Sequence, residues 1–482
     1  MGHPRNRWDF ALAGAVLLLL VWQLFAPPAL SVANDHDFEK ILGHICYAPV
    51  ETNQTPFFDF AALHYSYDAD SCIDWPMRTT NEAAFAVGWW LNGMFHSRTD
   101  FDLRYMGIVY GLIFLGGFVT MQRALRRVSL KLSVLAQTAW IVVFCNAVYV
   151  PMFNTLYFDA LSLATLTGAL AAMAVVALEP EPDRSWIAGA AIWLALLAGS
   201  KGQHAPLALL CVPALWIRPR RLAMARAVGT AAIVAGAWLS LTTMPRFYQG
   251  EATFNALFYR ILPAVADPQA YLAETKIPVS WARYSGEVAF AEDVPLRDPY
   301  YEEQFGKWFG PVDLIRLYLR HPSAAWIIAR ENLDEASMDR VRIRMAGVPH
   351  RLSNYEESQG KARQAISHFF TVWAGLKNAV FGARPVLYAV WIAAVIGVAW
   401  MLAPPGPRMR LLLAIVTAAL AAEFSICMLD GADGGRHLTI FNALLDFLVC
   451  CDVVLGARYI AGYMRRPEGL RQGRSHAPQL LS

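Results

Sequence analysis

Long apolar segments separated by short polar turns dominate this chain. Such segments approach the length that an α-helix needs to cross a membrane. They lie at about residues 9–27, 103–122, 132–150, 159–178, 185–200, 204–217, 227–243, 384–403, 409–429 and 439–461. The composition agrees, because 56% of the residues are hydrophobic and only 16% are charged, less than in an ordinary soluble protein. We therefore predict an all-α polytopic membrane protein with about ten transmembrane helices.

Lys and Arg gather in alternate connections between these segments. The groups are Arg5 and Arg7; Arg123, Arg126, Arg127 and Lys131; Arg218, Arg220, Arg221 and Arg226; Arg408 and Arg410; and Arg458, Arg465, Arg466, Arg471 and Arg474. Short cytoplasmic loops collect positive charge, so both termini are predicted to be cytoplasmic. Topology thus accounts for the basic residues, and we expect no nucleic-acid partner. In a bacterium the host would be the inner membrane, with the other connections facing the periplasm or exterior.

Two connections on the predicted outer side are long, residues 28–102 and 244–383. Neither has the length or self-contained pattern of an independent enzyme domain. We therefore predict one membrane-embedded domain over residues 1–461, followed by a basic cytoplasmic tail at 462–482.

Local patterns in the outer connections predict further elements. The amphipathic stretch 314–320 indicates a short helix lying over the membrane core. The Trp-rich stretch 84–91 is apolar but too short to cross, so it indicates an interfacial helix. Cys46 and Cys72 share the first outer connection, where an oxidising compartment would favour a disulfide.

Polar side chains interrupt the apolar pattern mainly on the predicted outer side. Asn34-Asp35-His36-Asp37 follows the first segment, and Asp159 begins the fourth. Lys201 and His204 lie between the fifth and sixth, while Arg436-His437 precedes the last. An acid at a helix start also suits the helix dipole, which is a simpler account of Asp159. Their convergence on one face predicts a single site.

Two cations point to an anionic ligand. Positive charge on the outer side works against the topology rule, so Lys201 and Arg436 are expected to have a compensating partner. Phosphate is the obvious candidate, and the glycines of Gly434-Gly435 would let the backbone approach it. A tight inter-helix turn explains those glycines equally well.

Acids that deprotonate a sugar hydroxyl and cations that hold a phosphate match glycosyl transfer from a polyprenyl-phosphate donor to a glycan or lipid acceptor. The predicted catalytic residues are Asp35, Asp37 and Asp159, with Asp35 or Asp37 as base. The predicted donor-phosphate ligands are Lys201, Arg436 and His437. The predicted substrate contacts are Asn34, His36, Asn154, Tyr157, Gln203, His204 and Tyr259. A divalent cation, Mg or Mn, held by Asp35 and Asp37 is a further expectation.

At these residues the chain resembles the integral-membrane glycosyltransferases of the GT-C fold, whose acidic position in the first outer loop corresponds to Asp35-His36-Asp37. A closer resemblance is to the bacterial WsfD-type hexose transferases. It rests on Asn154-Thr155-Leu156-Tyr157-Phe158-Asp159, Ser200-Lys201-Gly202-Gln203, Asn255-Ala256-Leu257-Phe258-Tyr259, Leu262-Pro263, Asp267-Pro268, Tyr318-Leu319-Arg320-His321-Pro322 and Asp430-Gly431-Ala432-Asp433-Gly434-Gly435-Arg436-His437-Leu438. The resemblance implies a GT-C-like bundle, an outer-face site under the long loop, and inverting transfer from a lipid-linked sugar. The acidic triplet departs from the adjacent acidic pair of protein mannosyltransferases.

Two other functions fit the same residues. A carrier or flippase of an anionic lipid or glycan would use Lys201 and Arg436 to bind phosphate, and Glu423 inside the ninth segment favours it. A structural contact explains a single Glu inside the membrane equally well. A non-catalytic subunit of an envelope-polysaccharide complex is the other alternative. Loss of transfer on mutation of the acids would separate an enzyme from both.

Overall fold

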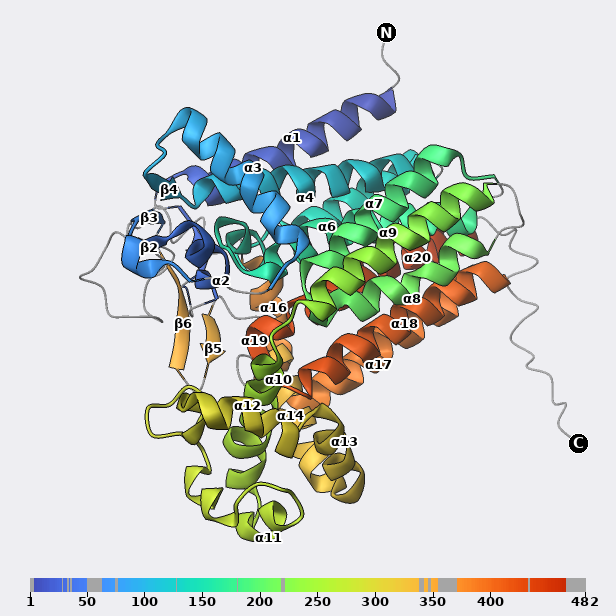
Figure 1. The fold of residues 1–482 in the computed structure, drawn as a ribbon. Coiled ribbons are helices and arrows are strands. Elements are labelled where there is room, and N and C mark those ends of the chain that lie inside the picture. The colour runs from blue at the N-terminus through green and yellow to red at the C-terminus, as the bar shows by residue number, and fades with distance from the viewer. Residues whose placement is uncertain are drawn as a thin grey trace, which may run out of the picture.

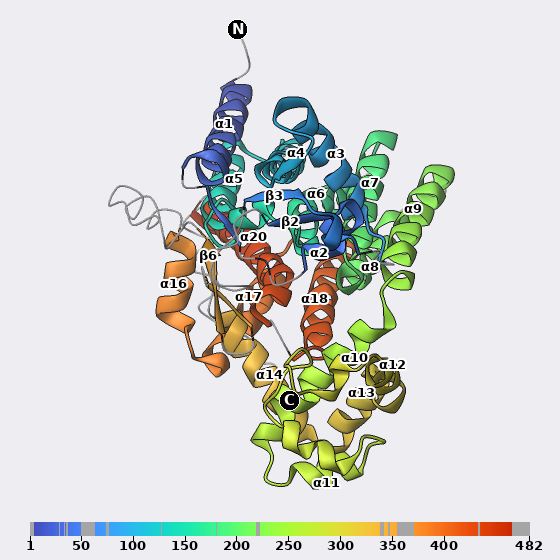
Figure 2. The ribbon, with the colours of Figure 1, turned by 60° about the vertical axis from the view of Figure 1, so that its left-hand side comes forward.

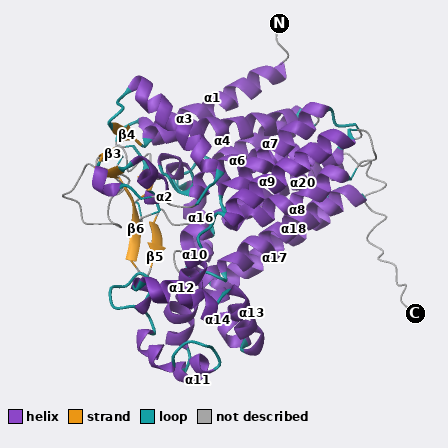
Figure 3. Ribbon diagram, viewed as in Figure 1, coloured by secondary structure: helices purple, strands orange, loops and turns teal. Residues whose placement is uncertain are grey.

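The computed structural model describes residues 4–27, 29–32, 34, 37–49, 63–73, 77–126, 128–179, 181–217, 222–337, 342–345, 348–353, 371–431 and 434–464. Helices make up most of this part of the chain, and the strands are short (Figure 3). The predicted all-α polytopic fold is confirmed.

Every predicted apolar segment forms a helix of one bundle (Figure 1). The bundle helices are α1 (Pro4–Phe25), α4 (Arg104–Leu125), α5 (Leu130–Phe144), α6 (Phe158–Leu178), α7 (Arg184–Ser200), α8 (Ala205–Trp216), α9 (Ala223–Thr242), α17 (Pro385–Leu402), α18 (Pro407–Cys427) and α20 (Thr439–Met464). Successive helices run in opposite directions, so α1 begins and α20 ends at the same end of the bundle. We call the opposite end, where α6 begins and α7 ends, the site end.

Within the described residues, seven helices are long and apolar enough to cross a membrane: α1, α4, α6, α9, α17, α18 and α20. The other three are shorter, with 15 residues in α5, 17 in α7 and 12 in α8. A helix rises about 1.5 Å per residue, so α8 reaches only about 18 Å. The hydrocarbon core is about 30 Å thick. Of the ten transmembrane helices that the sequence predicts, seven have spanning length and three are shorter.

Helix α6 lies at the centre of the bundle, since 89% of the residues in its apolar stretch are buried. Small residues let its neighbours approach closely, because a side chain at Gly117 of α4 would meet the backbone of Gly168. The indole of Trp140 on α5 donates to the Thr167 hydroxyl at 3.1 Å. These contacts fix the middle of α6 in the bundle, and Asp159 lies at the first turn of the same helix.

Two small antiparallel sheets cover the site end. One has the order β2-β3-β4, with β2 (Tyr47–Pro49), β3 (His64–Tyr67) and β4 (Asp100–Asp102). The other has the order β1-β6-β5, with β1 (Ser31–Val32), β5 (Arg342–Met345) and β6 (Val348–Ser353). Its β1 pairs with β6 in the register Ser31 with Ser353, which joins the two long connections.

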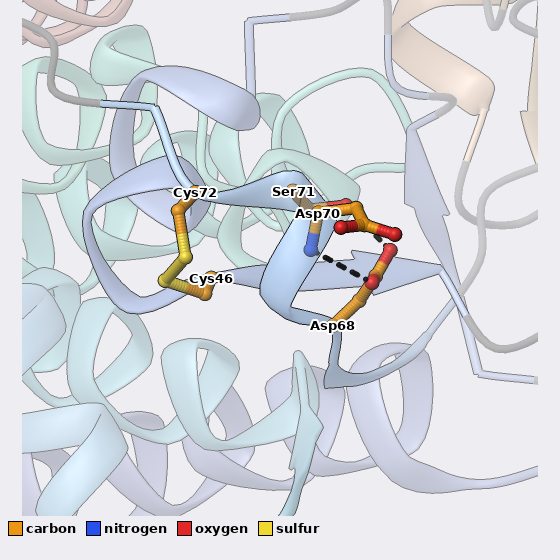
Figure 4. Close-up of a disulfide and its surroundings, with 5 residues drawn as sticks. All are labelled: Cys46, Asp68, Asp70, Ser71 and Cys72. Carbon is orange, nitrogen blue, oxygen red and sulfur yellow. Dashed lines mark hydrogen bonds between the residues drawn. A yellow bond between two sulfur atoms is a disulfide. The ribbon is translucent and has the colours of Figure 1, made fainter.

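The expected disulfide between Cys46 and Cys72 is present, with its Cα atoms 4.2 Å apart (Figure 4). Asp68 and Ser71 hydrogen-bond beside it, which orders the turn that leads to Cys72. The bridge closes the segment that begins just after the short helix α2 (Glu39–Leu42). It therefore fastens the polypeptide that follows Asp37.

The second long connection forms a helical lobe beside the site end (Figures 1 and 2). Its helices are α10 (Arg246–Phe254), α11 (Pro268–Ala273), α12 (Pro299–Trp308), α13 (Pro311–Arg320) and α14 (Pro322–Ser337), with a π-helical turn at Asn255–Ile261. The lobe has its own apolar core, in which Trp281 stacks on Phe305. The Tyr318 hydroxyl donates to the Met428 carbonyl at 2.6 Å, which fixes the lobe to the end of α18. Helix α16 (Val372–Phe381) leads back to α17.

The Trp-rich stretch forms helix α3 (Thr80–Phe95), which packs against α4. No charged residue occurs between Glu82 and His96. Val87, Trp90 and Met94 share one exposed face, with Trp90 59% exposed. Such a face suits lipid better than water, in agreement with the interfacial helix that the sequence predicts.

Candidate functional site

The segment after α1 carries the first acidic residues to the site end. The Ser31 hydroxyl donates to the Asn154 carbonyl at 2.7 Å, which ties this segment to the turn before α6. The Asn34 side chain accepts a bond from the Phe38 N–H at 3.1 Å and donates to Glu39 at 3.0 Å. Asn34 therefore organises the start of α2. Asp35 and His36 lie outside the described residues.

Asp37 lies between two cations. Its carboxylate accepts hydrogen bonds from Arg436, on the one-turn helix α19 (Gly434–His437), and from Lys40 on α2. Burial alone would raise the pKa of Asp37, but Arg436 and Lys40 outweigh it and hold this pKa well below its usual range. The same pairing raises the pKa of Lys40 against the effect of burial. Asp37 is therefore ionised at neutral pH, and 23% of its side chain is exposed.

Arg436 is buried against aromatic and polar neighbours. Its guanidinium lies 4.4 Å from the ring centre of Tyr157, a cation–π arrangement. It also donates to His437 Nε2 at 3.3 Å, while His437 Nδ1 lies 3.1 Å from Asp430. These partners fit a neutral imidazole that donates to Asp430 and accepts from Arg436. Burial and the charge of Lys201 lower the pKa of His437, in agreement with this assignment.

Asp159 and Lys201 form a second ion pair at the site end. Lys201 follows the last residue of α7, and its ammonium donates to both carboxylate oxygens of Asp159 at 3.0 and 2.9 Å. Only 1% of the Asp159 side chain is exposed, against 15% for Lys201. Asp159 is thus enclosed by its partners, which indicates a residue that holds Lys201 rather than one that meets a substrate.

His204 extends this pair into the bundle. Its Nε2 lies 3.0 Å from Asp159, and its Nδ1 lies 2.9 Å from Glu423 on α18. His204 and Glu423 are both fully buried. His204 was predicted to contact a substrate, but both of its ring nitrogens face carboxylates in the structure. Glu423, which the sequence offered as a feature of transporters, is an ion-pair partner of His204.

The lobe contributes residues that the sequence analysis missed. The ammonium of Lys40 lies 4.2 Å from the ring centre of Tyr248 on α10. Burial raises the pKa of Tyr248 to about 12. Burial also raises the pKa of Glu251 on the same helix to about 7, with Lys40 opposing the shift. No sequence motif marks Lys40. The only signal in the sequence was its position three residues after Asp37, the distance of one helical turn.

The remaining predicted contacts divide between the site and its scaffold. The Asn154 amide donates to the carbonyls of Leu24 and Leu30, so this buried residue has a structural role in place of the predicted substrate contact. The Gln203 amide donates to the His437 carbonyl at 3.2 Å. Tyr259 lies under the guanidinium of Arg260, which in turn donates to the Gly431 carbonyl at 2.6 Å, beside the glycine-rich turn.

Arg436 and Lys40 bind the carboxylate of Asp37, and cations beside that carboxylate do not suit a divalent metal. Within the described residues no group of three or more His, Cys, Asp and Glu side chains has the arrangement of a metal site. The predicted partner, Asp35, is outside that part of the chain. The divalent cation expected at Asp35 and Asp37 therefore stays a prediction.

The comparisons with known proteins identify a membrane family. The chain belongs to the family described as the YfdI N-terminal transmembrane domain, whose model matches residues 9–469. No curated protein matches it. Among solved structures it is similar to the archaeal oligosaccharyltransferase AglB from Archaeoglobus fulgidus, in complex with an inhibitory peptide and a dolichol-phosphate. That likeness has a TM-score of 0.41 and 12% identity, over 99% of this chain and 53% of that chain. The chain thus spans about half the length of that protein.

Proposed function

We propose that this member of the YfdI N-terminal transmembrane domain family is a membrane glycosyltransferase. It would move a sugar from a polyprenyl-phosphate donor to a glycan or lipid acceptor of the cell envelope, with inversion at the anomeric carbon. The site end would face the periplasm or exterior of a bacterial inner membrane, as the distribution of Lys and Arg predicts. The proposal includes a GT-C-type transferase similar to the WsfD-type members.

The observation that carries the proposal is the position of Asp37 between Arg436 and Lys40. A partly exposed carboxylate lies directly beside two cations, at the same end of the bundle as Lys201. Transfer from a phosphate-linked sugar needs this combination. A base must take the proton of the acceptor hydroxyl, and cations must stabilise the phosphate that leaves.

The chemical step follows from this arrangement. The carboxylate of Asp37 accepts the proton of the acceptor hydroxyl, and the hydroxyl oxygen attacks the anomeric carbon. The bond between that carbon and the phosphate oxygen breaks, and its electrons remain on the polyprenyl phosphate. Arg436, Lys40 and Lys201 stabilise the added negative charge. A phosphate that engages Arg436 and Lys40 also draws them from Asp37, which makes Asp37 a stronger base when the donor is bound.

Asp159 has a supporting role in this proposal. Its carboxylate already accepts bonds from Lys201 and His204 and is almost inaccessible. It would hold the ammonium of Lys201 toward the donor phosphate. Asp35 remains a second candidate for the base. The proposed transfer does not require the divalent cation predicted at Asp35 and Asp37, because Arg436 and Lys40 supply positive charge beside Asp37.

A flippase of a lipid-linked glycan is the competing function. The buried Glu423 was the feature that favoured it, since ionisable groups inside the membrane often line a transport path. The ion pair of Glu423 with His204 gives that residue a different explanation.

Transfer of radiolabelled sugar from a polyprenyl-phosphate hexose in purified membranes tests the proposal. Wild-type protein should form labelled glycan, and Asp37→Asn should reduce the rate by about a hundred-fold or more, the usual contribution of a general base. Asp313→Asn, in a partly exposed surface pair with Arg316, is the matched control and should keep full activity. Equal transfer by wild type and Asp37→Asn would reject Asp37 as base. Movement of labelled lipid across the bilayer without any product would favour the flippase.

A further inference from the structure

Four charged side chains form a continuous line from inside the bundle to the site end. Glu423 on α18 contacts His204, His204 contacts Asp159 at the start of α6, and Asp159 contacts Lys201 after α7. Each contact is 2.9 to 3.0 Å long. Lys201 is 15% exposed, whereas the other three are 0 to 1% exposed. Of these four side chains, only that of Lys201 therefore meets the exterior.

The contacts of the two ring nitrogens of His204 indicate its charge. A neutral imidazole has one N–H donor, and its other nitrogen carries a lone pair. In this site both nitrogens lie within hydrogen-bond distance of a carboxylate oxygen. A lone pair facing an ionised carboxylate would be repelled, so with Glu423 and Asp159 both ionised the arrangement fits an imidazolium that donates to both. The charges then alternate, with Glu423 and Asp159 negative and His204 and Lys201 positive.

Glu423 is directed at His204. Its Oε2 accepts the bond from the imidazolium, and its Oε1 is buried without a hydrogen-bond partner among the described residues. A buried carboxylate is costly unless it is paired, so its charge balances that of His204. Without Glu423 the imidazolium would be harder to maintain in an apolar interior.

The charge on His204 decides how firmly Asp159 holds Lys201. With His204 positive, Asp159 divides its attraction between two cations. With His204 neutral, the full charge of Asp159 would fall on Lys201 and tie the ammonium to the interior. The backbone around Lys201 is itself fixed, because Asn81 donates to the Ser200 carbonyl at 2.6 Å. The ammonium is therefore the part that the line of charges controls.

We propose that Glu423 and His204 are positioning residues that keep the ammonium of Lys201 available to the phosphate of a polyprenyl-phosphate ligand. This inference rests on the proposed function for the identity of the ligand. It does not require that a sugar be transferred, since it concerns the binding of the phosphate alone.

The test measures binding of a polyprenyl phosphate, and of the uncharged polyprenol, to purified protein by native mass spectrometry. We expect wild type to prefer the phosphate. Glu423→Gln should weaken phosphate binding about ten-fold, which corresponds to about 1.4 kcal/mol, and leave polyprenol binding unchanged. Glu423→Asp keeps the carboxylate, so its phosphate binding should lie between that of wild type and that of Glu423→Gln. If Glu423→Gln does not fold, His204→Gln removes the same positive charge and serves instead.

Two further variants separate positioning from general stability. Asp446→Asn breaks a comparably buried ion pair with Lys377, at 3.2 Å, and should not change the phosphate preference. In a Lys201→Met background, Glu423→Gln should have no further effect, because residues that act through one another are not additive. Unchanged phosphate binding in Glu423→Gln, an equal loss of polyprenol binding, a loss shared by Asp446→Asn, or additive effects would each overturn the inference. Phosphate binding without any sugar transfer by wild type would refute the proposed function while leaving this inference intact.

Discussion

The guanidinium of Arg436 donates a hydrogen bond to the carboxylate of Asp37, which lies 399 residues earlier in the chain. The bond joins the segment after α1 to the one-turn helix before α20. Lys40 binds the same carboxylate from the other side, and Tyr248 of the lobe covers Lys40. The site is therefore completed by three parts of the chain that are distant in sequence.

Replacement of Lys40 by Met should weaken donor use and shift the pH profile of transfer. Lys40 and Arg436 hold the pKa of Asp37 below its usual range, so loss of Lys40 should raise it. Asp37 then loses its charge at a higher pH, and the acidic limb of the pH–rate profile should move upward. The KM for donor should rise about ten-fold, for one lost charge contact of about 1.4 kcal/mol. Lys307→Met, at an exposed position of α12, should change neither quantity. An unmoved acidic limb would contradict the pairing.

Asp159→Asn should destabilise the folded protein far more than Asp37→Asn. It leaves the charges of Lys201 and His204 without their shared carboxylate, and loss of one partner from a buried ion pair typically costs about 3–5 kcal/mol. Asp37 is more exposed, so its replacement should cost less. Thermal unfolding in detergent measures the difference. A normal melting temperature with abolished transfer would instead indicate that Asp159 acts directly on a substrate.

The stability of the wild type should fall between about pH 4.5 and pH 7 relative to that of Glu251→Gln. Burial raises the pKa of Glu251 from 4.5 to about 7 in the folded protein. A raised carboxyl pKa means that the fold favours the neutral form, so its stabilising effect is complete at low pH and is lost as pH rises through about 7. The Gln variant stays neutral throughout. Melting temperatures of both proteins across this range test the prediction, and parallel curves would contradict it.

A cysteine in place of Trp90 should be protected by the membrane. Trp90 is 59% exposed on α3, and Tyr300 of α12 is similarly exposed at 61%, but only α3 presents an apolar face. A membrane-impermeant maleimide should label Tyr300→Cys in intact membranes and label Trp90→Cys only after detergent is added. The free native cysteines among the described residues are buried or only partly exposed, which keeps the background low. Equal labelling before detergent would place α3 in water.

Transfer should persist after treatment with EDTA. The described residues next to Asp37 supply positive charge through Arg436 and Lys40, so the leaving phosphate does not need a divalent cation. Rates measured before and after chelation, and again with Mg or Mn restored, test this directly. A rate that falls with EDTA and returns with the metal would support the predicted metal site at Asp35 and Asp37.

The sequence by itself determined the helical membrane bundle and the end at which the polar residues gather. Hydropathy and the placement of Lys and Arg are properties of short segments, so the ten helices and the shared end at which α1 begins and α20 ends could be derived without tertiary contacts. Proximity in sequence within one loop also sufficed for the disulfide between Cys46 and Cys72. The end of α5 was predicted too late, because the apolar segment continues to about residue 150 whereas the helix covers Leu130–Phe144. Helix ends depend on caps and packing, which hydropathy does not describe.

Only the tertiary structure decided which charges pair. Asp37 and Asp159 were both predicted to be catalytic, yet one is partly exposed beside Arg436 and the other is buried with Lys201 and His204. The role of Glu423 follows from its contact with His204, which lies 219 positions earlier in the chain. Coulombic attraction and desolvation depend on distances of a few ångströms between side chains, and the packing of α6, α7 and α18 sets those distances. No local pattern in the sequence encodes them.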